Sequence, residues 1–140
     1  MGRIEILAEF LAIELEEGET LEDYIEETDD NEFEAEGKTF LVLTDEEADE
    51  KAKEHIRNDL WAFNPEFLSG YTGLPVEVFS ALQEQHYEDC NETIFELVDK
   101  FGGLDKLADE AIGYDGRGHF MSSYDGQEHE LGEYFIYRTN

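Results

Sequence analysis

Hydrophobic residues between positions 44 and 65 recur at intervals of four and three, the spacing of one helix face. Thr44 and Glu47 have the spacing of a capping box, and Asn64 with Pro65 ends the pattern. The apolar stripe consists of Ala48, Ala52, Ile56, Leu60 and Phe63. This segment is therefore the most clearly predicted helix of the chain.

Opposite charges four residues apart lie on the outer side of this predicted helix. Glu47 precedes Lys51 and Asp49 precedes Lys53 by one helical turn, an orientation that stabilises helices. We therefore expect much of the charge of this helix to be neutralised locally.

Residues 33–43 read as two extended runs that meet at Glu36 and Gly37, a tight-turn signal that predicts a β-hairpin. In the second run Phe40 and Val42 share one face, whereas Leu41 and Leu43 share the other. Apolar residues on both faces indicate a strand that is covered on both sides and lies inside a sheet.

Shorter helical patterns occupy other parts of the chain. Thr20 is a candidate N-cap for a short acidic helix over 20–27, in which Leu21, Tyr24 and Ile25 face inward. A second helix begins near Pro75 and a fourth covers 104–113. A third covers 91–103, with inward residues Ile94, Leu97, Val98 and Phe101. The first 15 residues fit helix and strand equally well.

The segment 114–140 is rich in glycine and strand-like. Tyr-Asp-Gly occurs at 114–116 and at 124–126, which we interpret as two related turns flanking a strand over 119–124. A last strand covers 134–138. These patterns predict an α+β fold, a small antiparallel sheet of about four strands with about four to five helices packed mainly on one side. We expect a single domain over 1–140, with an acidic segment (1–37), a hairpin and helical middle (38–113) and a strand-rich tail (114–140).

The composition is that of a folded protein. Hydrophobic residues make up 40% and aromatic residues 13% of the 140 residues, too many for a disordered acidic chain. The single cysteine, Cys90, excludes an internal disulfide and fits a reducing compartment. The sequence contains neither an apolar run long enough to span a membrane nor a secretory signal, so we expect a cytoplasmic protein.

Charge is the most unusual property of the sequence. Thirty-eight acids face nine bases, a formal net charge of −29, and no base occurs in 4–37 or in 58–99. Direct binding to nucleic acid or to an anionic membrane requires a basic patch, which the sequence lacks. Two explanations remain open, adaptation to high salt or occupation of a basic cleft on another protein, and the aromatic content and the excess of Glu over Asp favour the second.

Outward acids at helical spacing are the candidate contacts for such a cleft. Carboxylates four and seven residues apart on a helix are separated by about 6 and about 10.5 Å of rise, and duplex phosphates by ~3.4 Å per step. Any amphipathic helix has outward residues at these spacings, so spacing alone does not decide between mimicry and a solvated surface. The candidates are Glu22, Asp23, Glu26, Glu27, Asp29 and Asp30, then Glu77, Glu84, Glu88, Glu92, Glu96 and Asp99.

Signals for catalysis or cofactors are weak. His119 and His129 have acidic neighbours, as a base with an orienting carboxylate would, but in so acidic a chain such neighbours are expected by chance. Residues 29–32 lack the alternation and the glycine of a calcium loop, and no Cys/His cluster or P-loop is present. We therefore predict no enzyme activity, no cofactor and no dedicated metal site.

Two long stretches carry a resemblance to known proteins. "FLVLTDEEADEKAKEHIRNDLWAFNPEFL" and "GRGHFMSSYDGQEHELGEYFIYR", within residues 39–138, resemble small acidic proteins encoded by bacteriophages and prophages. In size and charge, though in no motif, the chain is also similar to phage antirestriction and anti-CRISPR proteins that act as DNA mimics. The phage and prophage proteins are of unknown function, so this first resemblance implies no activity. The charge pattern and the similarity in class predict an inhibitor of a host defence protein with a Lys/Arg-rich cleft, and leave homodimerisation open.

An alternative interpretation assigns binding to aromatic side chains of the tail. Aromatic residues are enriched at protein interfaces, although the core of the sheet is their more common location. In this alternative the acids serve solubility. The candidate anchors are Tyr114, Phe120, Tyr124, Tyr134 and Tyr137.

Overall fold

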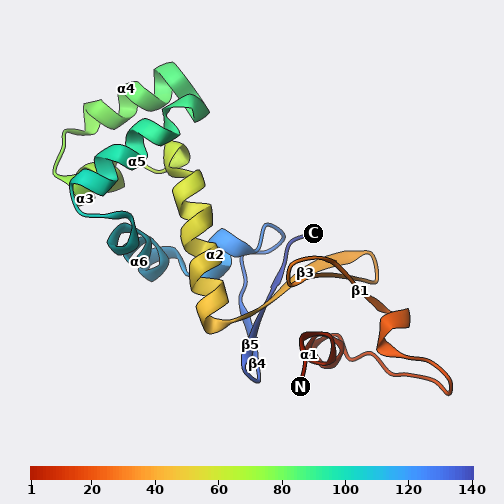
Figure 1. Ribbon diagram of the computed structural model, residues 1–140. Coiled ribbons are helices and arrows are strands. Elements are labelled where there is room, and N and C mark those ends of the chain that lie inside the picture. The colour runs from red at the N-terminus through yellow and green to blue at the C-terminus, as the bar shows by residue number, and fades with distance from the viewer. The chain divides into compact units, whose positions relative to one another are not determined.

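The computed structural model describes all 140 residues, which divide into two compact units. Unit 1 comprises Met1–Lys51 and Arg117–Asn140, and unit 2 comprises Ala52–Gly116. Helix α2 (Asp45–Asn58) contributes residues to both units (Figure 1). The unit boundaries differ from the three segments predicted from the sequence, because the C-terminal strands return to the sheet of unit 1. The prediction of a single domain stays a prediction.

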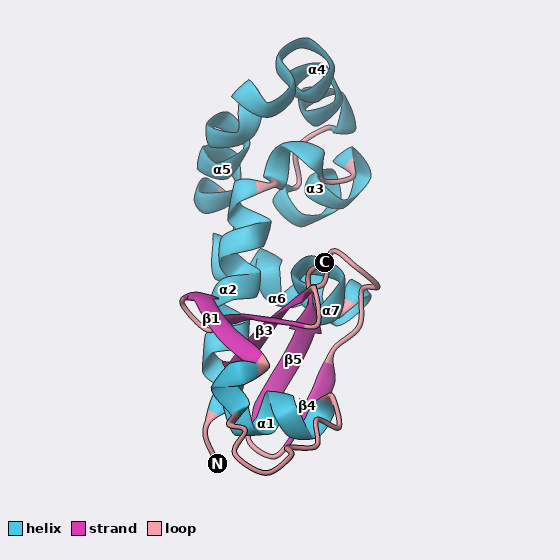
Figure 2. Cartoon of the chain, turned by 90° about the vertical axis from the view of Figure 1, so that its right-hand side faces the viewer, coloured by secondary structure: helices cyan, strands magenta, loops and turns pink.

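Unit 1 contains one antiparallel sheet of five strands in the order β1-β2-β3-β5-β4 (Figure 2). The α+β class is confirmed, and the sheet has five strands where about four were expected. Its helices are α1 (Arg3–Phe10) and α7 (Arg117–Met121). The strands are β1 (Ile25–Asp29), β2 (Glu32–Ala35), β3 (Lys38–Thr44), β4 (His129–Leu131) and β5 (Tyr134–Arg138).

The predicted hairpin is confirmed as β2 and β3. Ala35 pairs with Lys38, so that only Glu36 and Gly37 form the turn. Both have positive φ, 57° and 77°, as a type I′ turn requires. The right-handed twist of this turn matches that of the flanking strands, which fixes the register of the hairpin.

Helices cover both faces of the sheet in unit 1. Ile6, Leu7 and Ala8 of α1 join Phe40 and Val42 of β3 in one core cluster. On the opposite face Arg117 of α7 stacks on the ring of Phe135, 4.6 Å from its centroid. Helices contact the sheet on both sides because β3 and β5 are apolar on both faces.

Two segments have a different secondary structure from the predicted one. Residues 20–27 form a 3-10 turn (Leu21–Asp23) followed by β1, because Ile25 pairs with Ala35 across the sheet. Residues 119–124 are not a strand: α7 begins at Arg117 and buries Gly118 and Met121, three residues apart on one helical face.

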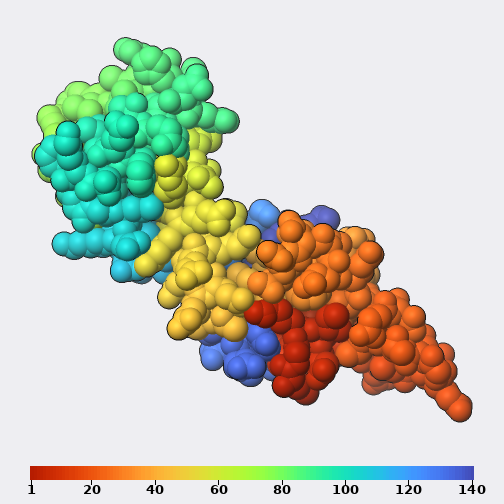
Figure 3. All heavy atoms as spheres, viewed as in Figure 1, coloured from red at the N-terminus to blue at the C-terminus, as the bar shows by residue number.

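Unit 2 is helical. It contains the end of α2, then α3 (Pro65–Thr72), α4 (Val76–His86), α5 (Asn91–Lys100) and α6 (Leu104–Asp115), as Figure 1 shows, with 3-10 turns at Leu60–Ala62 and Tyr87–Cys90. Figure 3 shows the heavy atoms of this unit packed against one another, coloured from yellow to teal. Its core includes Ala52, Ile56, Leu60, Phe79, Ile94, Val98 and Leu107.

One helix of unit 2 is absent from the sequence prediction, and one predicted inward residue lies at the surface. Helix α3 begins at Pro65, and the Asn64 side-chain oxygen caps it by accepting the Glu66 N–H at 2.8 Å. Pro65 therefore starts the next helix as well as ending the previous pattern. Phe101, predicted to face inward, is 46% exposed because α5 ends at Lys100.

The predicted capping box of α2 is confirmed, but its predicted ion pairs are replaced. The Thr44 N–H donates to Glu47 at 2.8 Å. Glu47 pairs with Arg3 at 2.6 Å instead of with Lys51. Asp49 pairs with Arg117 at 3.0 Å, and Lys53 lies 3.8 Å from both Asp105 and Asp109. Residues distant in sequence thus neutralise this helix.

The ion pair between Glu47 and Arg3 should make the stability of the fold depend on pH. Burial would raise the pKa of Glu47, but hydrogen bonds from Thr44 and Arg3 lower it below the ordinary 4.5. The Arg3 contact therefore stabilises the fold above pH 4.5 and is lost as the pH falls through the lowered value. We expect Glu47→Gln, which keeps the cap, to cost about 1 kcal/mol at pH 7 and less at pH 3 in urea unfolding.

Glu46→Gln is the matched control, because Glu46 is exposed in the same helical turn. Equal effects of the two substitutions at both pH values would contradict a stabilising contact between Glu47 and Arg3.

Candidate acidic surface

The first six candidate acids lie together at one edge of the sheet in unit 1, and all are exposed. Glu22 and Asp23 lie on the 3-10 turn, and the Thr20 N–H donates to Asp23 at 2.9 Å, which fixes that turn. The others follow on β1 and in the turn after it. We call Glu22, Asp23, Glu26, Glu27, Asp29 and Asp30 the edge acids.

Two of the edge acids lie directly opposite another acid on β2. Glu26 pairs with Glu34, and Asp29 pairs with Glu32. Like charges at directly opposed positions of an antiparallel pair are destabilising. The hairpin β1–β2 therefore carries a concentration of negative charge that its own stability does not require.

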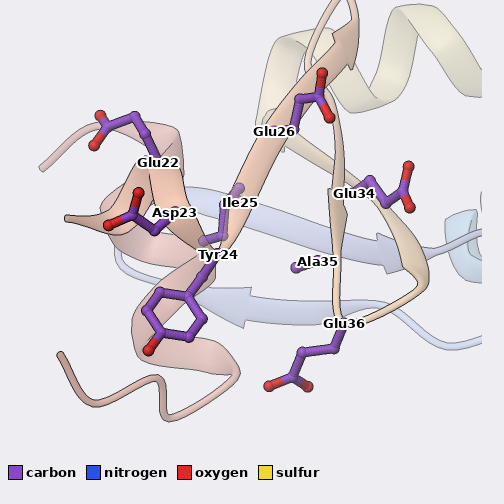
Figure 4. Close-up of a pocket in the computed structure, with 8 residues that line it drawn as sticks. All are labelled: Glu22, Asp23, Tyr24, Ile25, Glu26, Glu34, Ala35 and Glu36. Carbon is purple, nitrogen blue, oxygen red and sulfur yellow. The ribbon is translucent and has the colours of Figure 1, made fainter. Parts of the chain in front are cut away.

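Five carboxylates surround an open pocket of about 200 Å³ between the 3-10 turn, β1 and β2 (Figure 4). Glu22, Asp23 and Glu26 are edge acids, whereas Glu34 and Glu36 are not among the predicted contacts. The sequence signal for Glu34 is its alternation with Phe33 and Ala35, which places it on the outer face of β2. The sequence predicted a helix over residues 20–27, and a helix there gives no reason to expect that Glu34 lies opposite Glu26.

Tyr24, at the same pocket, is held by an acid outside it. Its hydroxyl donates to Glu19 at 2.6 Å. This hydrogen bond, with partial burial and the Glu19 charge, raises the pKa of Tyr24 to about 12. Tyr24 is therefore neutral at physiological pH, and the charge of the pocket comes from its carboxylates alone.

The basic residues with ion pairs are all bound to other acids. Arg3 pairs with Glu47 and Lys53 with Asp105 and Asp109. Arg57 pairs with Glu92, and Arg117 pairs with Asp45, Asp49 and Glu128. None of the edge acids takes part in an ion pair, so their charge is not neutralised within the chain.

The six candidate acids of unit 2 are exposed but form less regular rows than predicted. Glu77 and Glu84 lie on α4, which ends at His86, and Tyr87 has a φ of 48° that breaks the helical row before Glu88. Glu88 lies in the following 3-10 turn.

On α5 the predicted row of Glu92, Glu96 and Asp99 is present. The Arg57 guanidinium binds both oxygens of Glu92, at 2.8 and 2.9 Å, and this hydrogen bond, together with the Arg57 charge, lowers the pKa of Glu92. Glu92 is therefore partly neutralised, which makes the edge acids the stronger candidate site.

The five aromatic residues of the alternative interpretation do not form one exposed surface. Tyr134 and Tyr137 are buried in the sheet, so they cannot serve as exposed anchors. Tyr124 is half covered by Arg138, whose guanidinium carbon lies 3.5 Å from the ring centroid. Phe120 is half-buried, and Tyr114 is 81% exposed but belongs to unit 2.

The residues considered for catalysis do not gather into a site. His119 and His129 are both exposed, and the acidic pocket contains no histidine. No group of three or more His, Cys, Asp and Glu side chains is arranged to hold a metal ion. Cys90 is buried, which raises the pKa of its thiol.

Comparison with protein-family models, with curated proteins and with solved structures gives no match for this chain. None of its helices combines the length and the apolar composition needed to cross a membrane.

Proposed function

We propose that this protein is a non-enzymatic inhibitor that uses its acidic surface to occupy the Lys/Arg-rich, nucleic-acid-binding cleft of a host defence protein. In this proposal the protein acts in the cytoplasm, as phage antirestriction and anti-CRISPR proteins do. The observation that carries the proposal is the cluster of edge acids, exposed on a folded hairpin and without basic partners.

Fixed charge distinguishes this surface from a solvated acidic tail. The edge acids are attached to a strand and a hydrogen-bonded turn, and Ile25, on the inner side of the same strand, is only 2% exposed. A partner therefore meets carboxylates whose backbone positions are already set. Preorganisation of this kind lowers the entropic cost of binding.

Protection of the sheet edge is the simpler explanation of these acids. Charged residues on edge strands prevent association between sheets. One charge in the middle of β1 would serve that purpose, whereas the hairpin also places Glu34 opposite Glu26 and Glu32 opposite Asp29. The additional acids oppose folding of the hairpin and support a role in binding.

Neutralisation of the edge acids tests the proposal. The tagged protein would capture its partner from host lysate, and the captured protein would be purified for affinity measurements. We expect replacement of the edge acids by Asn and Gln to weaken binding at least about tenfold, because close charge pairs contribute strongly at such interfaces. Duplex DNA should compete with the unmodified protein, and binding should weaken as salt rises.

The matched control removes the same number of charges elsewhere. Glutamine replaces six exposed glutamates that are not predicted contacts: Glu46, Glu50, Glu54, Glu66, Glu110 and Glu133. Equal losses in both variants would attribute binding to net charge alone. Binding that resists high salt, or that DNA does not compete for, would exclude mimicry.

A further inference from the structure

All four arginines of the chain stack on aromatic rings of the same chain. Three of them also bind carboxylates, so that one guanidinium contacts a ring and an acid at the same time. None of the five lysines is stacked in this way. The stacked pairs are Arg3 with Tyr134, Arg57 with Phe95, Arg117 with Phe135 and Arg138 with Tyr124. In this fold a ring beside an acid is therefore a site for arginine.

The site of Arg57 in unit 2 shows the arrangement most clearly. Glu92 and Phe95 lie three residues apart on α5, which makes them neighbours on the helix surface. The Arg57 guanidinium carbon lies 4.2 Å from the ring centroid of Phe95. The nitrogens of the same group bind both oxygens of Glu92, at 2.8 and 2.9 Å. An acid three residues before a ring thus forms a complete arginine site.

Tyr87, at the end of α4, has an acid at the same spacing but no cation. Glu84 precedes it by three residues, and the Tyr87 N–H still donates to the Gln83 carbonyl, as in a helical turn. Glu88 and Asp89 follow Tyr87 directly. These three acids are exposed, and none of them takes part in an ion pair. The Tyr87 ring is 70% exposed and carries no stacked arginine.

The backbone of Tyr87 is strained and held in place. Its φ of 48° and ψ of −129° lie outside the regions that residues with a side chain ordinarily adopt, and glycine would be favoured. Its N–H donates to Gln83, and its carbonyl accepts from the Cys90 thiol at 2.9 Å. An exposed ring adds little to the core, so the fold itself gives no reason for a tyrosine at this position. Strained residues of this kind cluster at functional sites.

We propose that Tyr87, together with Glu84, Glu88 and Asp89, binds an arginine side chain of a partner protein. The guanidinium would lie over the Tyr87 ring and donate hydrogen bonds to the carboxylates, as at the site of Arg57. Arginine fits better than lysine because its planar group stacks on a ring while its N–H groups bind acids. The site belongs to unit 2 and the edge acids belong to unit 1, so the inference does not depend on the proposed function.

A second copy of this chain is a poor source of this arginine. Each of its four arginines already stacks on a ring, and three of them are held by acids. Two copies would also bring together two net charges of −29. The occupant is therefore an exposed arginine of a different, basic protein, which long-range attraction would draw toward so acidic a chain.

Two short peptides that differ only in the cation test the site. The probes are acetyl-Gly-Arg-Gly-amide and acetyl-Gly-Lys-Gly-amide, titrated into the isotope-labelled full chain and followed by NMR at the Tyr87 and Glu88 amides. We expect the arginine peptide to bind at least about threefold more tightly, because stacking adds to the charge attraction that both peptides share. Equal affinities, or no saturable shift at these amides, would overturn the inference.

Substitution of the ring separates stacking from charge. Tyr87→Leu should abolish the preference for arginine measured at the Glu88 amide. Tyr124→Leu is the matched control, because Tyr124 is also exposed but Arg138 already covers its ring at 3.5 Å. This control should keep the preference. A preference that survives Tyr87→Leu, or that disappears equally in both variants, would overturn the inference.

Substitution of the acids tests the carboxylates of the site. Glu84→Gln combined with Glu88→Gln should weaken the binding of both peptides at least about threefold. Glu46→Gln combined with Glu50→Gln removes the same number of charges from exposed positions of α2, and the affinity at Tyr87 should then change less. Equal losses in the two double variants would attribute binding to net charge alone and overturn the inference.

Glycine at position 87 tests whether the ring serves binding or the fold. Tyr87→Gly should raise the melting temperature by at least about 2 °C, because glycine adopts this backbone conformation without strain, and should also weaken binding of the arginine peptide. A lower melting temperature would show that the ring serves the fold and would overturn the inference. If the peptide fails to bind while neutralisation of the edge acids abolishes capture of the host protein, the proposed function stands without this site.

Discussion

Arg117→Ala should lower the free energy of unfolding by about 3 kcal/mol, because it removes the nearly buried cation that three acids share. The Arg117 side chain is 10% exposed and binds Asp45 at 2.7 Å, Asp49 at 3.0 Å and Glu128 at 2.8 Å. Burial would lower the pKa of Arg117, but hydrogen bonds to Glu128 and Asp45 raise it above its ordinary value.

The same cluster includes the buried Tyr137. Its hydroxyl donates to the Glu128 oxygen that Arg117 also binds. Burial and this hydrogen bond raise the pKa of Tyr137 above its ordinary value. Loss of Arg117 therefore affects the face of β5 that carries Phe135 and Tyr137 as well as the start of α2. The expected loss is at the lower end for buried pairs because Asp45 and Asp49 remain exposed to water.

Urea unfolding measures this effect, with Arg138→Ala as the control. Arg138 lies over the exposed ring of Tyr124 and donates to the Asn140 carbonyl, so its loss should cost less than about 1 kcal/mol. Arg117→Lys should recover only part of the stability, because one ammonium cannot reproduce the fork of donors. Similar unfolding midpoints for both alanine variants would contradict the structural role of Arg117.

Gly118→Ala should also destabilise the protein by about 3 kcal/mol, because α7 approaches the backbone of 126–128 closely. A Cβ at Gly118 would lie 2.4 Å from the Gly126 carbonyl oxygen and 2.8 Å from the Gln127 carbonyl carbon. Both atoms belong to the main chain, so a side-chain rotation cannot relieve the contact. The clash would displace the segment that carries Glu128, the partner of Arg117.

Gly113→Ala is the matched control, with an expected change of the opposite sign. Gly113 lies within α6, and no atom lies within 4 Å of the Cβ it would acquire. Alanine should therefore stabilise the helix by about 0.5–1 kcal/mol. Thermal unfolding measures both variants. If their melting temperatures shifted in the same direction, the close approach of Gly118 to the backbone of 126–128 would be contradicted.

These two effects concern the scaffold and leave the edge acids in place, which makes them independent of the proposed function. Arg117 draws α2, α7 and the segment before β4 together, whereas the edge acids lie on the other edge of the sheet. A variant weakened at Arg117 should therefore keep its charge-dependent binding at temperatures where it remains folded.

Local signals in the sequence determine several elements of the fold. The stripe from Ala48 to Ile56 with its Thr44–Glu47 cap defines α2, which ends at Asn58 and so leaves the predicted stripe residues Leu60 and Phe63 outside the helix. The Glu-Gly turn at 36–37 defines the hairpin β2–β3. Each of these signals lies within one turn or one strand pair. The sequence also suffices to show an excess of negative charge with no basic patch.

Tertiary structure determines the secondary structure of segments whose local pattern fits both a helix and a strand. Residues 25–29 form a strand because β2 supplies a partner for Ile25, and 117–121 form a helix because Gly118 fits against 126–128. The partners of Glu47, Asp49 and Lys53 are likewise distant residues instead of helical neighbours.

The candidate site shows the same division. Composition and the inward residue Ile25 indicate that the acids of 22–30 are held by the fold, and the sequence alone determines their charge. Only the pairing of β1 with β2 places Glu34 opposite Glu26 at the edge of the sheet. Strand register depends on contacts between segments, so no local pattern in residues 20–27 could have shown it.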